Sequence, residues 1–361
     1  MARFSRIFRG RCSKWHKCVP KSLRLMLLAV CSLSQTPDAR FMDCAGSAFD
    51  STLNVLERGV WLIGLFCFCL VTVGVTTVVT TFYKYAMPIM WMGNGLVFTL
   101  YMVYGHYLLV NIVFHYYMGV FTNPGNPPKV AGFDPYNSKL QKGWRVCYQC
   151  EQPKPPRAHH CRVCNKCVLK MDHHCPWLFN CVGHYNHRYF MLFMVFMWLG
   201  TMFVVNCLWR RALYFLNREQ TTIPSLLQGY GFDSVLEDQS QFPRHGDYEE
   251  LLVLLVFFVC FAVTIALLML GGWHVYLITV AETSIEVHIN RNELKQHRKN
   301  GKTFTNIYHH GYIHNWRMFL GLANGRSFLR HVILPSCHKP IGNGMEWFDT
   351  KEHCYAVSDT V

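Results

Sequence analysis

Four long stretches of this 361-residue chain contain no Lys, Arg, Asp or Glu. They are Val60–Tyr83, Tyr85–Pro128, Tyr189–Trp209 and Leu251–Ala281. The second is too long for a single span, and we expect Leu96–Phe121 to be the part that crosses the membrane. About 20 apolar residues in a helix cross a bilayer core, because a helix pairs its own backbone polar groups within the lipid. The sequence therefore predicts an all-α integral membrane protein with four transmembrane helices.

The charges between these stretches predict the orientation. Residues 1–58 and 122–188 each contain ten Lys and Arg, against four and three Asp and Glu, and 282–361 is also basic. The segment 210–250 has more acidic than basic residues. Because basic segments remain on the cytoplasmic side, we expect both termini and the central segment there. The net charge of +14 then reflects orientation and attraction to anionic lipid rather than to nucleic acid, for which no reading motif is present.

The predicted organisation has five parts. They are a cytoplasmic N-terminal segment 1–58, a transmembrane hairpin 59–121, a cytoplasmic cysteine-rich zinc-binding domain 122–188, transmembrane helices 189–281 with a lumenal loop 210–250, and a cytoplasmic tail 282–361. The cysteine-rich domain begins at a Pro- and Gly-rich turn that ends the second span. A helix is expected over Glu282–Arg298, and no internal repeat is evident.

Seven of the 17 cysteines lie between Cys147 and Cys181. A tetrahedral zinc site takes four thiolate or imidazole ligands, so six cysteines and two histidines would fill two sites and leave one thiol over. The candidate ligands are Cys147, Cys150, His160, Cys161, Cys164, Cys167, His174 and Cys181. The segment has too few aliphatic residues for a core of its own, so we expect metal to hold its fold. His159, His184 and His187 are surplus, and we expect them to be solvated or hydrogen-bonded.

The remaining thiol is Cys175, which follows Asp172, His173 and His174. An acid, a base and a sulfur nucleophile within four residues are the components of an activated-cysteine centre. Disulfides are not expected, because the predicted compartment is reducing.

These motifs resemble the cysteine-rich domain of the Asp-His-His-Cys (DHHC) protein S-acyltransferases, which are four-span membrane palmitoyltransferases. The resemblance is carried by Arg157-Ala158-His159-His160-Cys161, Cys164-x2-Cys167, Lys170-Met171-Asp172-His173-His174-Cys175-Pro176-Trp177 and Asn180-Cys181-Val182-Gly183. The tail is similar to the subgroup called zinc finger DHHC member sixteen. It contains Glu282-Thr283-Ser284-Ile285-Glu286, Asn315-Trp316 and Gly342-Asn343-Gly344-Met345.

The resemblance implies two structural Zn²⁺ ions. One would be bound by Cys147, Cys150, His160 and Cys167, and the other by Cys161, Cys164, His174 and Cys181. It also implies that Cys175 takes the acyl group from acyl-CoA, with His173 as general base and Asp172 orienting its imidazole.

Other residues have supporting roles in this prediction. Ser284 can donate a hydrogen bond to Asp172, Asn315 ties the tail to the active-site face, and Trp177 lies at the mouth of an acyl cavity that Gly200 deepens. Arg162, Lys166 and Lys170 are candidates for binding the CoA phosphates, with a solvated basic face as an equal alternative. Asn123-Pro124-Gly125 replaces the family's usual Asp-Pro-Gly, which puts an acidic role there in doubt.

The predicted function is transfer of palmitate from palmitoyl-CoA to cysteine thiols of substrate proteins, in the endoplasmic reticulum or Golgi membrane. The alternative is a membrane-tethered zinc scaffold without catalysis, but a scaffold has no use for Cys175 or His173. A metal transporter would require more ionisable residues in the spans than His106, His115 and His274. An accessory subunit, or a PDZ domain that binds the terminal Asp359-Thr360-Val361, is a further possible partner.

Overall fold

The computed structural model describes residue 59 and residues 62–88, 94–218 and 247–347. The chain forms two compact units, Met1–Gly59 and Val60–Val361. All contacts described below lie within the second unit. The expectations for segment 1–58, for most of the loop 210–250 and for the terminal Asp359-Thr360-Val361 fall outside the described residues.

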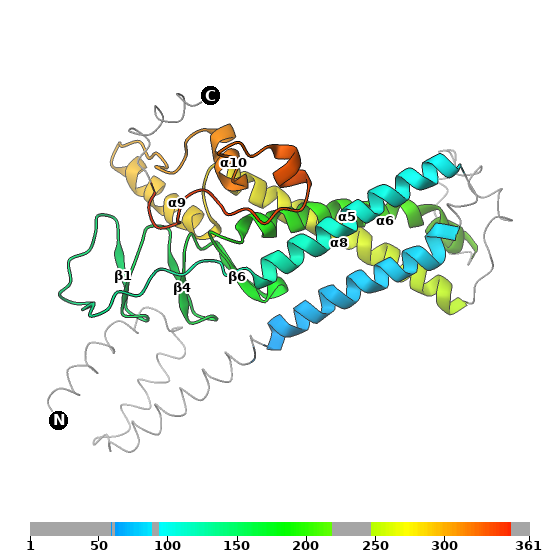
Figure 1. The fold of residues 1–361 in the computed structure, drawn as a ribbon, viewed down its shortest axis with the longest axis horizontal. Helices are drawn as coiled ribbons and strands as arrows, with labels where there is room; N and C mark the ends of the chain where they lie inside the picture. Colours follow the sequence, from blue (N-terminus) through cyan, green and yellow to red (C-terminus); the bar gives the residue numbers. More distant parts are fainter. Residues whose placement is uncertain (1–58, 60–61, 89–93, 219–246, 348–361) are drawn as a thin grey trace, which may run out of the picture. The chain divides into compact units, whose positions relative to one another are not determined.

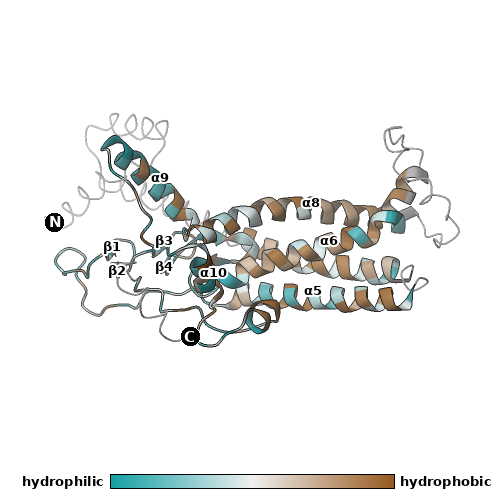
Figure 2. Ribbon diagram, turned by 90° about the horizontal axis from the view of Figure 1, so that it is seen from above, coloured by the Kyte–Doolittle hydropathy of each residue, from teal (hydrophilic) through white to brown (hydrophobic). Residues whose placement is uncertain are grey.

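Four helices in the described part of the chain are long and apolar enough to cross a membrane. They are Leu62–Ala86, Gly95–Phe121 within α5, His187–Leu213 within α6, and Tyr248–Thr279 within α8. The full elements are α5 (Gly95–Phe121), α6 (His187–Arg218) and α8 (Asp247–Thr279), and the first helix ends in the π-turn η1 (Phe82–Ala86). Figure 2 shows hydrophobic residues along α8 and hydrophilic ones on the following helix α9 (Ser284–Lys299). The four predicted spans are therefore present as helices.

The helix boundaries differ from the prediction by a few residues. The third span begins at His187 rather than Tyr189, and the fourth ends at Thr279 rather than Ala281. Ala281 has a left-handed backbone, with a φ of 57°, so the helix cannot continue through it.

Helix α6 is the central element of the helical part. It packs against both α5 and α8. Half of the residues in its most apolar stretch are buried, compared with 11% of those in the corresponding stretch of the helix Leu62–Ala86. Its aromatic side chains reach across to α5, where the Phe193 and Tyr116 ring centroids are 5.0 Å apart. The other helices are thus arranged around the helix that begins directly after the cysteine-rich segment.

The cysteine-rich segment contains three short antiparallel hairpins at one end of the apolar helices (Figure 1). They are β1 (Arg145–Cys147) with β2 (Gln152–Lys154), β3 (His159–Cys161) with β4 (Lys166–Val168), and β5 (His173–Cys175) with β6 (Asn180–Val182). Isolated hairpins of this length are not stable in water. Their small buried cluster contains only Cys161, Val168, Met171 and Cys181, which fits the expectation that metal holds this segment together.

Two asparagines attach this segment to the end of α5. Asn180 Nδ2 donates to the carbonyls of Val120 and Thr122, at 3.0 Å each, and Asn186 Nδ2 donates to that of Gly119 at 3.3 Å. The last carbonyls of a helix have no partner within the helix, so these amides satisfy them. The hairpin β5–β6 is therefore fixed against the helical part.

The turn between α5 and the hairpins requires glycine. Gly125 has a φ of 101°, and a Cβ there would lie 2.8 Å from the Tyr185 ring. Its carbonyl accepts from Leu169 N at 3.0 Å, and its own N donates to Asn123 Oδ1. Asn123 therefore shapes the turn through its side chain, a role that needs no negative charge.

The tail folds back onto the ends of the apolar helices. It contains α9, α10 (Tyr312–Leu320) and the π-turn η5 (Leu329–Ile333). Thr283 caps α9 in a capping box with Glu286. Asn315 on α10 donates to the carbonyl of Thr279, the last residue of α8, at 2.8 Å. Arg188 on α6 donates to two tail carbonyls, so both helices bind the tail directly.

Candidate active site and metal centres

The first group of predicted metal ligands comes together in the structure. The Cys150 and Cys147 sulfurs lie 3.2 and 3.6 Å from His160 Nδ1, and the Cys167 and Cys150 sulfurs are 3.8 Å apart. Ligands about 2.0–2.3 Å from a tetrahedral zinc are separated by about 3.4–3.8 Å. These four residues could therefore hold one metal ion.

The second group has the same form. His174 Nδ1 lies 3.4 Å from the Cys164 sulfur, 3.6 Å from that of Cys181 and 3.8 Å from that of Cys161. Both groups contain three thiols and one imidazole, and both match the sets implied by the family resemblance. Thiolate and imidazole donors in fours suit zinc better than a hard cation such as Mg²⁺.

The hairpins form a structural repeat that we did not detect in the sequence. The cross-strand pairs Val146–Pro153, His160–Cys167 and His174–Cys181 recur at equal intervals. The turns recur as well, because Glu151, Asn165 and Phe179 occupy equivalent positions and have left-handed φ angles of 50°, 48° and 50°. The expectation of no internal repeat is therefore wrong, and the sequence carried the signal, because Cys147, Cys161 and Cys175 are equally spaced and His160 and His174 are separated by the same interval.

The repeat explains how the two metal sites interlock. Each site combines the Cys-x2-Cys turn of one hairpin with the His–Cys cross-strand pair of the next. In the third hairpin, Cys175 occupies the place of the ligand Cys161, and Leu178 that of the ligand Cys164. No fourth hairpin follows in the described residues, so Cys175 has a ligand's position and no metal partner there.

The strand β5 separates the predicted catalytic side chains from a candidate metal ligand. Successive residues of a strand point to opposite faces, so His173 and Cys175 share one face and His174 points to the other. His174 lies in the second metal group, whereas His173 hydrogen-bonds Asp172, and the nearby Cys175 thiol helps to raise the pKa of His173. The Cys175 side chain is buried, with 4% of its surface exposed.

Asp172 is held by several donors. His173 Nδ1 donates to its Oδ2 at 2.6 Å, and Ser284 donates through its backbone N to Oδ1 at 2.8 Å and through Oγ to Oδ2 at 3.0 Å. The predicted bond from Ser284 is therefore present. Burial is the largest single influence and opposes ionisation of both groups, but the Asp172–His173 hydrogen bond, their mutual charge attraction and the other neighbouring groups together outweigh it. The pKa of Asp172 is held below its usual range, and that of His173 is raised to about 9.

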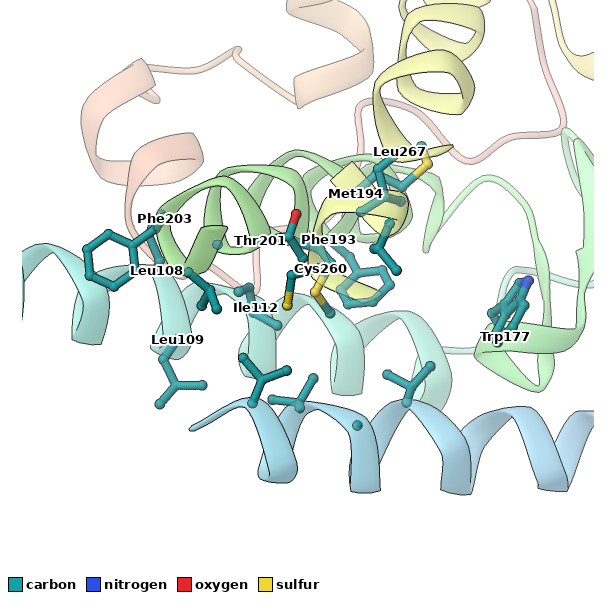
Figure 3. Close-up of a pocket in the computed structure, with 18 of the residues that line it drawn as sticks. Leu108, Leu109, Ile112, Trp177, Phe193, Met194, Thr201, Phe203, Cys260 and Leu267 are labelled. Atoms are coloured by element: carbon teal, nitrogen blue, oxygen red, sulfur yellow. The ribbon is translucent and has the colours of Figure 1, made fainter. Parts of the chain in front are cut away.

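An apolar cavity of about 670 Å³ lies between the four spans and reaches the active site. Cys175, His173 and Trp177 lie among its lining residues, and Trp177 is half exposed. Figure 3 shows side chains of α5, α6 and α8 around it, including Leu108, Leu109, Ile112, Phe193, Met194, Phe203, Cys260 and Leu267. Gly200 is also part of the lining, as expected, together with Gly74 and Gly105, which we did not single out.

A buried ion pair joins the hairpins to the tail. Arg157 donates through Nε and Nη2 to the two carboxylate oxygens of Glu286, at 2.7 and 2.6 Å. Its guanidinium lies 4.2 Å from the Tyr308 ring centroid and 4.6 Å from that of Trp347. Burial opposes the charge of Glu286, but Arg157 outweighs it and lowers the pKa of the carboxyl. Both residues belong to motifs that resemble those of the DHHC family, but nothing in the sequence predicts that they form a pair.

The three candidate CoA contacts have different surroundings. Arg162 is exposed in the turn between β3 and β4, and Lys166 is half-buried on β4. The Lys170 amine lies 5.8 and 5.6 Å from the Phe319 and Trp347 rings of the tail, and burial lowers its pKa to about 7. Lys170 therefore packs beneath the tail rather than on an open basic face.

The surplus histidines are all at least partly buried. His184 bonds the Gly342 carbonyl at 3.2 Å, in line with a hydrogen-bonded role. His187 is 3% exposed, and neither ring nitrogen has a hydrogen-bond partner among the described residues. The structure therefore gives His187 no protein hydrogen-bond partner among the described residues, and α6 carries it into the interior beside Asp172 and His274.

Comparison with known proteins agrees with these motifs. The sequence pattern of the family described as DHHC palmitoyltransferase matches residues 140–291. The chain is 40% identical to Palmitoyltransferase ZDHHC16A of Danio rerio over 271 residues, which cover 68% of this chain and 67% of that protein. It is 36% identical to ZDHHC16B of the same species over 332 residues, or 87% and 84% of the two chains. It is 38% identical to ZDHHC16 of Homo sapiens over 250 residues, which cover 68% of this chain and 64% of that protein.

These relatives carry the name of the subgroup that the tail motifs predicted, and the matched pattern spans both metal groups and the Asp172–Cys175 motif. The chain therefore belongs to the DHHC palmitoyltransferase family.

Proposed function

We propose that this chain S-acylates cysteines of other proteins through an acyl-enzyme intermediate on Cys175. The observation that carries the proposal is the position of Cys175 and His173, which share one face of β5 at the end of the apolar cavity. A long acyl chain in that cavity would bring its thioester to the sulfur. A scaffold would need neither this cavity nor the His173–Asp172 pair.

In the first half-reaction His173 takes the proton of the Cys175 thiol, and the thiolate attacks the acyl-CoA carbonyl. A bond forms between sulfur and acyl carbon, the bond from that carbon to the CoA sulfur breaks, and His173 gives the proton to the CoA thiolate. In the second half-reaction His173 takes the proton of a substrate thiol, whose sulfur attacks the acyl carbon. The bond from that carbon to the Cys175 sulfur breaks, and Cys175 regains the proton. Asp172 holds His173 in the tautomer that presents Nε2 to the sulfur.

Palmitate is the acyl group we propose, because the cavity lining is almost entirely apolar. At about 0.8 kcal/mol per buried CH₂, a palmitoyl chain gains roughly 12 kcal/mol on leaving water. Trp177 would lie at the entrance of the cavity. Arg162 and Lys166 remain the proposed contacts for CoA phosphates, and Lys170 would contribute only positive field from beneath the tail.

The metals that fit the two Cys/His groups are structural Zn²⁺ ions. Each would be bound by the four ligands described above and would hold its hairpin turns in place. We further propose that the hairpins and the tail lie on the cytoplasmic side of the endoplasmic reticulum or Golgi membrane, in keeping with the basic charge of 122–188. Cysteine-containing proteins on that side would be the substrates.

The test is the intact mass of purified protein after incubation with palmitoyl-CoA, with zinc counted in the same samples. Wild type should gain a hydroxylamine-labile palmitoyl adduct, and Cys175→Ser should gain none while keeping two zinc ions. Cys337→Ser is the matched control, because Cys337 is exposed and lies outside the site. An adduct of normal yield on Cys175→Ser would overturn the assignment of the nucleophile. Two zinc ions without an adduct on wild type would favour the scaffold.

A further inference from the structure

The Asp172 carboxylate has one acceptor position that the known contacts leave open. A carboxylate offers about four lone-pair sites. His173 Nδ1 and Ser284 Oγ use two on Oδ2, and Ser284 N uses one on Oδ1. Asp172 is 1% exposed, so bulk water does not reach the remaining site on Oδ1.

Two histidines from the apolar helices face this carboxylate. His187 begins α6, and His274 lies near the end of α8, and both are 3% exposed. A nitrogen of each and an oxygen of Asp172 all lie within 4.8 Å of one another. Both nitrogens of His187 and Nδ1 of His274 have no hydrogen-bond partner within the described ranges. Buried polar atoms are rarely left in this state, so the cluster requires a shared partner.

The spacing identifies that partner. Neither histidine has a nitrogen within 4.0 Å of an Asp172 oxygen, since His173 is the only described ion-pair partner of that carboxylate. The shortest separations of the two histidines from Asp172 therefore fall between 4.0 and 4.8 Å. Ligands on a tetrahedral zinc are about 3.4–3.8 Å apart, and the ligand atoms of the two Cys/His groups lie 3.2–3.8 Å apart. A water with hydrogen bonds of about 2.8 Å in a tetrahedral arrangement separates its partners by about 4.6 Å.

We propose that His187, His274 and Asp172 hold one ordered water, and that the two histidines are positioning residues for Asp172. The water donates to Asp172 Oδ1 and to one imidazole nitrogen, and it accepts the N–H of the other imidazole. Three hydrogen bonds are the usual number for a buried water. The inference rests on the proposed function, because Asp172 acts through His173 on Cys175.

The arrangement connects catalysis with the helices that bind the acyl chain. His274 and His173 both line the cavity, and their ring centroids are 5.8 Å apart. Since α6 and α8 also form its walls, the same two helices hold the acyl chain and the carboxylate that orients the base. Removal of the histidines should therefore slow the reaction at Cys175 even at saturating palmitoyl-CoA.

The test compares wild type with His187→Phe/His274→Leu and with His187→Gln/His274→Gln in the full chain. Two rates are measured at one fixed pH, namely alkylation of Cys175 by iodoacetamide, located by mass mapping, and single-turnover acylation over a range of palmitoyl-CoA concentrations. Both rates should fall about tenfold in the apolar variant, equivalent to about 1.4 kcal/mol, and the acylation rate should stay low at saturating palmitoyl-CoA. The glutamine variant keeps hydrogen-bonding groups and should recover most of the loss. Metal content should be two ions throughout.

Wild-type rates in the apolar variant would overturn the inference, and so would a third metal equivalent that is present in wild type and lost in that variant. If the apolar double variant does not retain two metals, the comparison of His274→Leu with His274→Gln decides in the same way. The alkylation assay uses no acyl-CoA. A wild type that forms no palmitoyl adduct but shows the predicted alkylation differences would therefore refute the proposed function and keep the inference.

Discussion

The room inside the cavity depends on individual residues, and two glycines in its lining differ in what surrounds them. A Cβ on Gly200 would lie 2.7 Å from Ile112 Cδ1, whereas a Cβ on Gly74 would meet nothing within 4 Å. A side chain at position 200 must therefore displace Ile112 further into the cavity or occupy that space itself. A side chain at position 74 has open space beside it and needs no such shift.

The first prediction is that Gly200→Tyr shifts acyl preference from palmitoyl-CoA towards lauroyl-CoA. Loss of burial for two CH₂ groups costs about 1.6 kcal/mol, so the preference should change about tenfold in a competition assay read by intact mass. Gly271→Tyr is the matched control, because Gly271 lies on α8, does not line the cavity and has nothing within 4 Å of an added Cβ. An unchanged acyl-chain preference in Gly200→Tyr would show that the cavity lining at Gly200 does not determine which chain length is accepted.

At the scale of elements, the third hairpin explains why Cys175 is free to react. Its turn has a left-handed backbone at the same position as the other two turns, but Leu178 replaces the second cysteine. Leu178 is 1% exposed and packs against Gly119 of α5, where a Cβ would lie 3.2 Å from its Cδ2. A position that binds metal in the second hairpin therefore anchors the third hairpin to the helical part.

This equivalence predicts that Leu178→Cys creates a metal-binding Cys-x2-Cys turn with Cys175. Added Cd²⁺ or Zn²⁺ should then inhibit self-acylation of the variant at concentrations that leave wild type unaffected, since thiolates are strong ligands for both ions. Metal content should exceed two ions per chain in the variant. Leu178→Met, which conserves side-chain volume, should retain activity and show no added inhibition. Equal sensitivity of wild type and Leu178→Cys would contradict the structural equivalence.

A second prediction at this scale concerns the ion pair that joins Arg157, just before β3, to Glu286 on α9. Arg157→Met leaves the Glu286 carboxylate buried without its partner, which costs about 3–5 kcal/mol when one member of such a pair is removed. Because Ser284 on the same helix bonds Asp172, self-acylation should fall together with protection of residues 300–347 from protease. Arg157→Met/Glu286→Leu should recover part of the protection. A fully protected tail in Arg157→Met would mean that other contacts hold it.

At the scale of the whole molecule, the helices and metal-ligand sets could be predicted from the sequence, whereas the contacts between distant residues could not. The four spans were predictable because lipid requires long uncharged helices, and the ligand sets followed from a specific family motif. The pairing of Arg157 with Glu286 was not predictable, because the two residues are far apart in sequence and meet only after the tail folds back. The same applies to His187 and His274, which lie on different helices and converge on Asp172.

The molecule combines a helical part stabilised by apolar contacts with hairpins whose Cys/His groups could each hold a metal ion. Strands of three residues and a buried cluster of a few side chains cannot stabilise residues 145–182 alone. Metal binding would therefore contribute to the folding free energy of the hairpins, but not to that of the apolar helices. The proposed catalytic residues His173 and Cys175 lie on the third hairpin, so a metal at His174 and Cys181 would help to fix their geometry.

The last prediction follows from this division. Zinc removal by a membrane-permeable chelator should abolish self-acylation and expose residues 122–188 to protease, while the helical circular dichroism of the detergent-solubilised protein changes little. Metal loss should precede or accompany loss of activity, as followed by a colorimetric zinc indicator. Cys150→Ala and Cys164→Ala test the sites separately. Cys164→Ala removes a ligand of the metal that His174 binds directly beside His173, so it should lower acylation more than Cys150→Ala. Equal activity of the metal-free and metal-loaded enzyme would show that the hairpins hold their active geometry without zinc.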